Sequence, residues 1–182
     1  STGSASPDYY GGLRPGDDKW ANSVVALDAR TGRLVWGYQL VHHDLWDYDT
    51  ASAPVLADVP VGGRLVPAVI AGNKTGFLYV LDRKTGKPLY PVEERPVPQS
   101  ATPGEATSPT QPIPAFLPAV TRQSVGPDDL FGGNDEERAA CRKTLDELGV
   151  GAVFTPPSVK GIIAVPGNAG GMNWSGFGYE PV

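Results

Sequence analysis

The chain has 182 residues, the size of one domain, and 40% of them are apolar, which is enough for a core. A formal net charge of −5 and a pI of about 4.9 argue against a surface that binds nucleic acid or an anionic membrane. The single cysteine, Cys141, excludes an internal disulfide, and no apolar run approaches the ~20 residues that span a bilayer. The 23 glycines and 19 prolines predict many turns and short elements.

The chain opens with an irregular segment. Residues 1–21 are rich in Gly, Pro and Asp and are predicted to lie over a scaffold rather than to form strands. No signal peptide opens the chain, and Ser1 starts a loop-like Ser-Thr-Gly-Ser. We therefore expect an excised or mature piece of a longer protein.

A repeated hairpin motif comes next. Two β-rich runs, 23–28 and 33–38, flank a Thr-Gly turn, and the same pattern, Leu-Asp-x-x-Thr-Gly, returns at residues 81–86. Asp28 and Asp82 lie 54 residues apart. An internal repeat of this length, made of short strands, predicts a β-propeller.

One blade of the propeller can be written out in full. Its four antiparallel strands are expected at 53–57, 65–71, 76–82 and 87–92. In an up-and-down sheet, the loop that leads into the first strand and the loop between the second and third strands lie at the same end. The first of these is residues 42–49, and the second contains Lys74.

Residues 42–49, here called the acid loop, read His-His-Asp-Leu-Trp-Asp-Tyr-Asp. Charges beside aromatic rings suit neither a regular strand nor a helix, but they suit a loop whose carboxylates are tuned by an apolar wall. A surface loop anchored by its aromatics is the plain alternative. Because strand order brings Lys74 to the same rim, a functional site is favoured. Asp44 and Asp49 are expected to be structural, one as a loop cap and one as an ion-pair partner.

Residues 91–158 break the strand rhythm and are predicted to be an insertion. Its first part is proline-rich, extended and without a strand pattern. One helix is expected at about 135–148, with Asn134 as N-cap and Gly149 at its end. Strand character returns at 160–166 and 177–181.

The glycine-rich loop before the last of these strands, residues 170–174, is expected on the rim of the acid loop. Its alternative is a simple turn with a packed Trp174. Either way, Gly-rich backbone allows close approach.

These motifs resemble a known family. The segment 26–36, Ala-Leu-Asp-x-x-Thr-Gly-x-x-x-Trp, is similar to the tryptophan-docking motif of quinoprotein dehydrogenase propellers. The acid loop resembles the matching segment of membrane-bound glucose and quinate dehydrogenases that use pyrroloquinoline quinone (PQQ). The resemblance extends through Lys74-Thr75-Gly76 and the proline-rich motifs to 166–168, so it covers nearly the whole chain.

The resemblance implies roles for individual residues. Asp47, the aspartate of Leu-Trp-Asp, falls on the family's catalytic base, which also contacts the metal. Lys74, 27 residues later, falls on a cofactor-contacting lysine. Asn173 and Trp174 match a cofactor-contacting loop of the alcohol dehydrogenases, although the glucose enzymes carry an acid at the place of Asn173. The implied cofactors are PQQ and a divalent cation, Ca²⁺ or Mg²⁺, ligated mostly by residues outside this chain.

The sequence thus predicts an all-β fold: part of an eight-bladed quinoprotein propeller over 1–182, about two blades plus part of a third, with the 91–158 insertion carrying one helix. The expected function is PQQ-dependent oxidation of a sugar or polyol hydroxyl with a quinone acceptor, in the periplasm, with membrane association of the full-length protein left open. Two alternatives remain: a non-catalytic propeller scaffold that binds proteins, and an inactive part of the dehydrogenase lacking the rest of the propeller.

Overall fold

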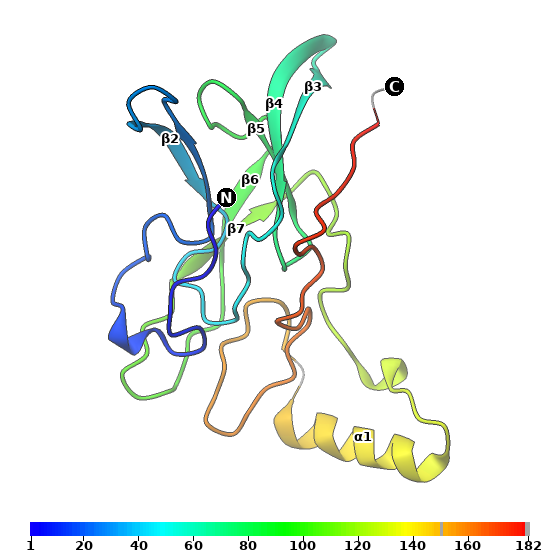
Figure 1. Cartoon of the computed structure of the whole chain (residues 1–182). Helices are drawn as coiled ribbons and strands as arrows, with labels where there is room; N and C mark the ends of the chain where they lie inside the picture. Colours follow the sequence, from blue (N-terminus) through cyan, green and yellow to red (C-terminus); the bar gives the residue numbers. More distant parts are fainter. Residues whose placement is uncertain (150, 181–182) are drawn as a thin grey trace.

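The computed structural model describes residues 1–149 and 151–180 and shows a mostly β architecture with small antiparallel sheets (Figure 1). The first sheet pairs β1 (Ser23–Leu27) with β2 (Leu34–Gln39). The second has the order β3-β4-β5, with β3 at Val55–Val61, β4 at Arg64–Gly72 and β5 at Leu78–Asp82. The third pairs β6 (Val92–Pro96) with β7 (Thr110–Pro114).

The two copies of the repeated motif fold into the same turn. Oδ1 of Asp28 accepts hydrogen bonds from the backbone N–H of Arg30 and from both the N–H and hydroxyl of Thr31, at 2.9–3.0 Å. Asp82 does the same with Lys84 and Thr85, at 2.8–2.9 Å. Hydrogen bonds from the threonines lower the pKa of both aspartates. The repeat in the sequence therefore corresponds to a repeated turn in the structure.

The tryptophan of the first copy docks on the turn of the second. The indole N–H of Trp36 donates to the carbonyl of Arg83 at 3.1 Å. A Cβ on Gly86 would lie only 2.6 Å from the Trp36 ring, so the missing side chain is what lets the ring approach. This contact joins β2 to the sheet β3-β4-β5.

The predicted four-stranded blade has three strands in the structure, and the prediction of a strand at 87–92 is wrong. Residues 87–89 pair with β5 through an isolated bridge between Leu81 and Pro88 and through two hydrogen bonds, from Asp82 N to Lys87 O and from Leu89 N to Val80 O. Pro88 and Pro91 have no N–H to donate, so a longer ladder cannot form there. The chain instead turns into β6.

The prediction that the proline-rich part of 91–158 lacks strands is also wrong. The proline-rich strands β6 and β7 pair over five residues, from Val92–Pro114 to Pro96–Thr110. Proline is tolerated here because this ribbon has two strands, so each strand has an unpaired edge where no N–H is needed. That residues 91–158 form an insertion within the propeller domain remains a prediction.

Helix α1 (Asp135–Leu148) is confirmed at its predicted bounds. The Asn134 side chain accepts from Glu137 N at 2.9 Å, and Gly149 donates to Leu145 O at the other end. Leu145 is its one buried residue, so the helix packs through a narrow contact and lies away from the sheets (Figure 1).

Strands were expected at 160–166 and 177–181, and the structure forms none over 160–166 or 177–180. Pro181 lies outside the described residues. Both segments would be the first or last strand of a neighbouring blade, and strand propensity alone does not hold a strand that lacks a partner.

The main core lies under the acid loop. Leu40, Val41, Leu45, Trp46 and Tyr48 pack there with side chains of β4 and β5 and with Phe154. In the part of the chain that the structure describes, no helix combines the length and apolar character needed to cross a membrane.

Gly86→Ala should destabilise the full-length protein more than Gly32→Ala. Both glycines have left-handed backbone, with φ of +71° and +69°, so both variants carry a strain of about 1 kcal/mol. An added Cβ at Gly32 meets nothing within 4 Å, whereas at Gly86 it collides with Trp36, adding about 1–3 kcal/mol. Urea denaturation of both variants measures the difference, and equal losses would contradict the docking contact.

Candidate active site

The acid loop is built around one buried carboxylate, Asp44. It is 1% exposed, and it accepts hydrogen bonds from the backbone N–H of Trp46 at 2.9 Å and of Tyr48 at 2.7 Å. The Asn22 amide donates to it at 2.8 Å, and the Ser4 hydroxyl also donates. Burial raises the pKa of Asp44, and these hydrogen bonds oppose the rise. Asp44 thus caps the loop from inside, the role expected of one of the flanking acids.

Asp47 lies in sequence between Trp46 and Tyr48, whose backbone N–H groups donate to the Asp44 carboxylate. Its φ of +59° lies in the left-handed region, which is rare for a residue with a side chain. Such a conformation persists only where the surroundings impose it, and the bonds to Trp46 N and Tyr48 N do so on either side. Its carboxylate is 21% exposed, partly shielded but reachable.

Lys74 reaches the acid loop from the turn between β4 and β5. The Lys74 side chain is 7% exposed, and its ammonium donates to Asp47 Oδ2 at 2.9 Å and to Asp49 Oδ2 at 2.7 Å. The expectation that strand order brings Lys74 and Asp47 to the same rim is confirmed, and Asp49 is the second partner of the lysine. Two of the three ammonium donors are used, so a third is left for a ligand oxygen.

The three charges titrate differently. Burial raises the pKa of Asp47, against the lowering effect of the Lys74 hydrogen bond. Burial acts on Asp49 too, but hydrogen bonds from Lys74 and from the Ser4 N–H, at 2.6 Å, outweigh it and lower its pKa. Burial would lower the pKa of Lys74, yet its two carboxylate partners raise it. One lysine therefore pairs with two carboxylates whose pKa values are shifted in opposite directions.

Aromatic rings form the floor of the loop. Trp46 and Tyr48 stack with centroids 5.8 Å apart, and Phe154 meets both edge-on at 5.2 and 6.0 Å. The Trp46 indole N–H donates to Thr155 O at 2.6 Å, and the Tyr48 hydroxyl donates to Pro166 O at 2.7 Å. Both polar tips are thus satisfied by residues more than a hundred positions away, which fixes the rings.

The loop 170–174 reaches the same rim through its backbone. Gly171 N donates to Lys74 O at 2.8 Å, and a Cβ on Gly170 would lie 2.5 Å from the Lys74 side chain, so glycine is required there. The side chains predicted to contact a cofactor do not converge on Lys74. Asn173 donates back to Ala169 O, and the Trp174 ring is 83% exposed. Their roles stay predictions.

A cavity of about 310 Å³ adjoins the Trp46 ring. Its walls come from the irregular N-terminal segment and from residues 157–168, and they are Tyr9, Trp46, Pro157, Ile162, Ala164, Gly167 and Asn168. The Asn168 amide donates to the Tyr9 hydroxyl at 2.8 Å across this region.

A metal site is not complete within residues 1–149 and 151–180, which hold no group of three or more His, Cys, Asp or Glu able to ligate an ion. Asp47 could offer one carboxylate oxygen, since Lys74 bonds only its Oδ2. Further ligands would have to come from elsewhere, and ligation by residues outside this chain stays a prediction.

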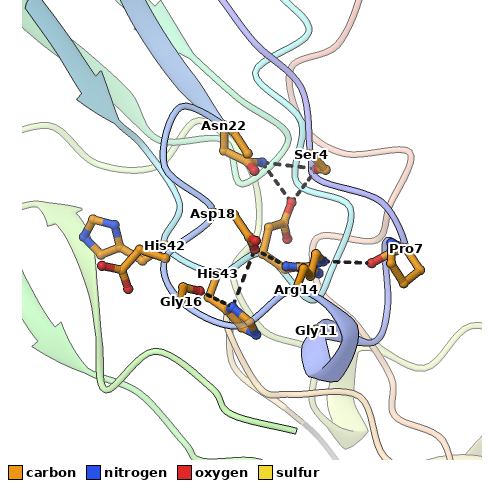
Figure 2. Close-up of polar contacts among 12 residues, drawn as sticks. Ser4, Pro7, Gly11, Arg14, Gly16, Asp18, Asn22, His42 and His43 are labelled. Carbon is orange, nitrogen blue, oxygen red and sulfur yellow. Dashed lines mark hydrogen bonds and ion pairs between the residues drawn. The ribbon is translucent and has the colours of Figure 1, made fainter.

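Sequence reasoning missed the polar network behind the loop. Arg14 bonds the Asp44 carbonyl and pairs with Asp18, while Asn22 reaches the Asp44 carboxylate (Figure 2). These residues lie in an irregular segment with no periodicity to mark them. Their only signal is composition: an arginine and an asparagine among glycines and acids.

Comparisons with known proteins show the family of the chain. A family described as "PQQ: Glucose/ethanol/alcohol dehydrogenase, beta-propeller domain" matches residues 1–182. The chain belongs to this family.

Among its relatives, the quinoprotein glucose dehydrogenase of Escherichia coli (strain K12) is 41% identical over 180 residues, 98% of this chain. The quinate/shikimate dehydrogenase (quinone) of Acinetobacter baylyi is 40% identical over 181 residues, also 98% of the chain. The chain spans 22% of the length of each. The crystal structure of quinohemoprotein alcohol dehydrogenase from Comamonas testosteroni superposes on 94% of this chain and 20% of its own, with a TM-score of 0.54 and 25% identity.

Lys74→Met should destabilise the full-length protein by about 1–3 kcal/mol at pH 7, less than for a fully buried pair because Asp47 and Asp49 keep about a fifth of their exposure. The loss should shrink toward acid pH. Because the pKa of Asp49 is lowered from 3.8, its stabilising contribution is present above that value and disappears as pH falls through the lowered one. Denaturation at pH 7 and pH 3 measures this, with the exposed Lys87→Met as control. A loss independent of pH would argue against the charge pair.

Proposed function

We propose that this chain supplies the base and a cofactor-binding lysine of a PQQ-dependent dehydrogenase that oxidises a hydroxyl group of a sugar or polyol. Glucose- or quinate-like compounds are the proposed substrates and a quinone the electron acceptor. The observation that carries the proposal is the shared ion pair: Lys74 donates to Asp47 and Asp49 at one rim. The chain spans about a fifth of its relatives' length, so we assign the activity to the full-length protein.

Asp47 is the proposed base. Oxidation of an alcohol requires removal of the hydroxyl proton while hydride leaves the adjacent carbon. A carboxylate accepts a proton better when its pKa is raised toward the working pH, and burial raises that of Asp47. Its left-handed backbone, imposed from both sides, holds the carboxylate in one place.

Lys74 is the proposed cofactor contact. Its third N–H can donate to a quinone or carboxylate oxygen of PQQ, and its raised pKa keeps the ammonium charged. Bound PQQ would supply the two-electron acceptor, and a Ca²⁺ or Mg²⁺ ion beside it the polarisation of the accepting carbonyl. In the same proposal, Asp47 also ligates that ion, and Asn173 and Trp174 contact PQQ.

Two further points belong to the proposal. A periplasmic location follows from the resemblance to the glucose and quinate enzymes. A purely structural propeller that binds proteins is disfavoured, because such a scaffold has no use for a buried lysine that joins two carboxylates of an aromatic-floored loop.

Asp47→Asn in the full-length protein should lower kcat by about 100-fold or more, the scale for a lost general base, while PQQ binding changes little. Asn keeps the size of the side chain and removes its basicity. Steady-state kinetics and equilibrium binding of PQQ measure the two effects. Asp58→Asn, which alters a half-exposed carboxylate paired with Arg83, is the control. Full turnover by Asp47→Asn would refute the assignment.

A further inference from the structure

Two neighbouring histidines each face a glutamate, in opposite surroundings. Nε2 of His42 lies 3.1 Å from Glu94 Oε1, and the two side chains are 24% and 53% exposed. Nε2 of His43 lies 3.2 Å from Glu105 Oε1, with the side chains only 2% and 3% exposed. Figure 2 shows His42 pointing away from the network that encloses His43. Only the second pair is cut off from water.

The partners of His43 hold both nitrogens of its ring. Nδ1 lies 2.5 Å from Gly16 O, and since a carbonyl can only accept, Nδ1 is the donor in this contact. Nε2 lies 3.2 Å from Oε1 of Glu105. Glu105 itself accepts from Gly11 N at 2.8 Å and from Ala106 N at 3.0 Å, so the ring is fixed from both sides.

Further charged groups lie around the ring. Asp18 Oδ2 lies 3.5 Å from Nδ1, and Asp18 is itself paired with Arg14. His43, Asp18, Arg14 and Glu105 thus form a buried polar cluster. A buried charge needs such pairing, because removing one partner leaves the other uncompensated.

This cluster ties two distant segments, the N-terminal segment and the connection between β6 and β7, to the acid loop. Glu105 belongs to the connection between β6 and β7, and Gly11 begins the short 3-10 helix η1 (Gly11–Leu13). His43 directly precedes Asp44, whose carbonyl accepts from Arg14 and whose carboxylate holds the N–H groups on both sides of Asp47. The position of Asp47 therefore depends on the His43 contacts.

We propose that His43, held between Gly16 and Glu105, is a positioning residue for Asp47, and that loss of its contact with Glu105 releases the acid loop. The proposal rests on the assignment of Asp47 as base. It predicts that turnover depends on a contact that lies outside the reacting groups.

Glu105→Gln in the full-length protein tests this, with Glu94→Gln as the matched control. Removing the carboxylate weakens the contact with Nε2, so the acid loop should loosen and kcat should fall about 10-fold or more. KM should change little. Glu94→Gln makes the same substitution on the exposed His42 pair and should leave kcat unchanged. An unchanged kcat for Glu105→Gln would overturn the proposal.

A second variant moves the pair without removing any charge. A Cβ on Gly11 would lie 2.0 Å from His43 Nε2, so Gly11→Ala should displace the ring and lower kcat about 10- to 100-fold at every pH. Amide hydrogen exchange of residues 44–49 supplies a measurement that needs no turnover. Exchange should rise in Glu105→Gln and Gly11→Ala but not in Glu94→Gln. Because it does not depend on activity, this arm tests the positioning even if Asp47 proves not to be the base; equal exchange in all three would contradict it.

Discussion

A carboxylate removed from water must be given hydrogen bonds, and the acid loop is shaped by the groups that Asp44 gathers for this purpose. Two of its partners are backbone N–H groups of the loop itself, and two are side chains of the N-terminal segment, Asn22 and Ser4. Satisfying this one charge folds the loop back on itself and brings the irregular first residues of the chain over it. The left-handed backbone of Asp47 is a consequence of the same bonds.

The sequence was informative where structure is local. The Asp-x-x-Thr-Gly turn needs only a carboxylate, a hydroxyl and a glycine within five residues, and α1 needs only its cap and its propensities, so both were predicted correctly. The rim shared by Asp47 and Lys74 also followed, because strand parity depends only on the order of elements. The pairing of Lys74 with two acids rather than one required coordinates to identify.

The other strands and site residues could not be predicted from the sequence, for physical reasons. Strands β6 and β7 are proline-rich runs that lack strand periodicity, so their pairing depends on tertiary contacts that the sequence pattern does not reveal. The opposite error occurred at two segments. At residues 87–92, Pro88 and Pro91 limit the pairing with β5, and residues 160–166 form no strand although the run is apolar and β-branched. In the site, Arg14, Asn22 and Glu105 act across 22 to 62 residues of chain, and no spacing rule connects them to the acid loop.

The contrast between Asp47 and Asp49 explains how one lysine can serve both structure and chemistry. Both carboxylates bond the same ammonium, at 2.9 and 2.7 Å, and both are about a fifth exposed. Asp49 has one more donor, the Ser4 N–H, and this bond helps to lower its pKa. Asp47 has no such backbone donor among its described hydrogen bonds, and the charge of Asp49 beside it adds to the effect of burial in raising its pKa. Neighbouring groups whose pKa values are driven apart can divide their roles. In the proposed function, Asp49 stays ionised and holds Lys74 charged, so that Asp47 is the carboxylate that would exchange a proton.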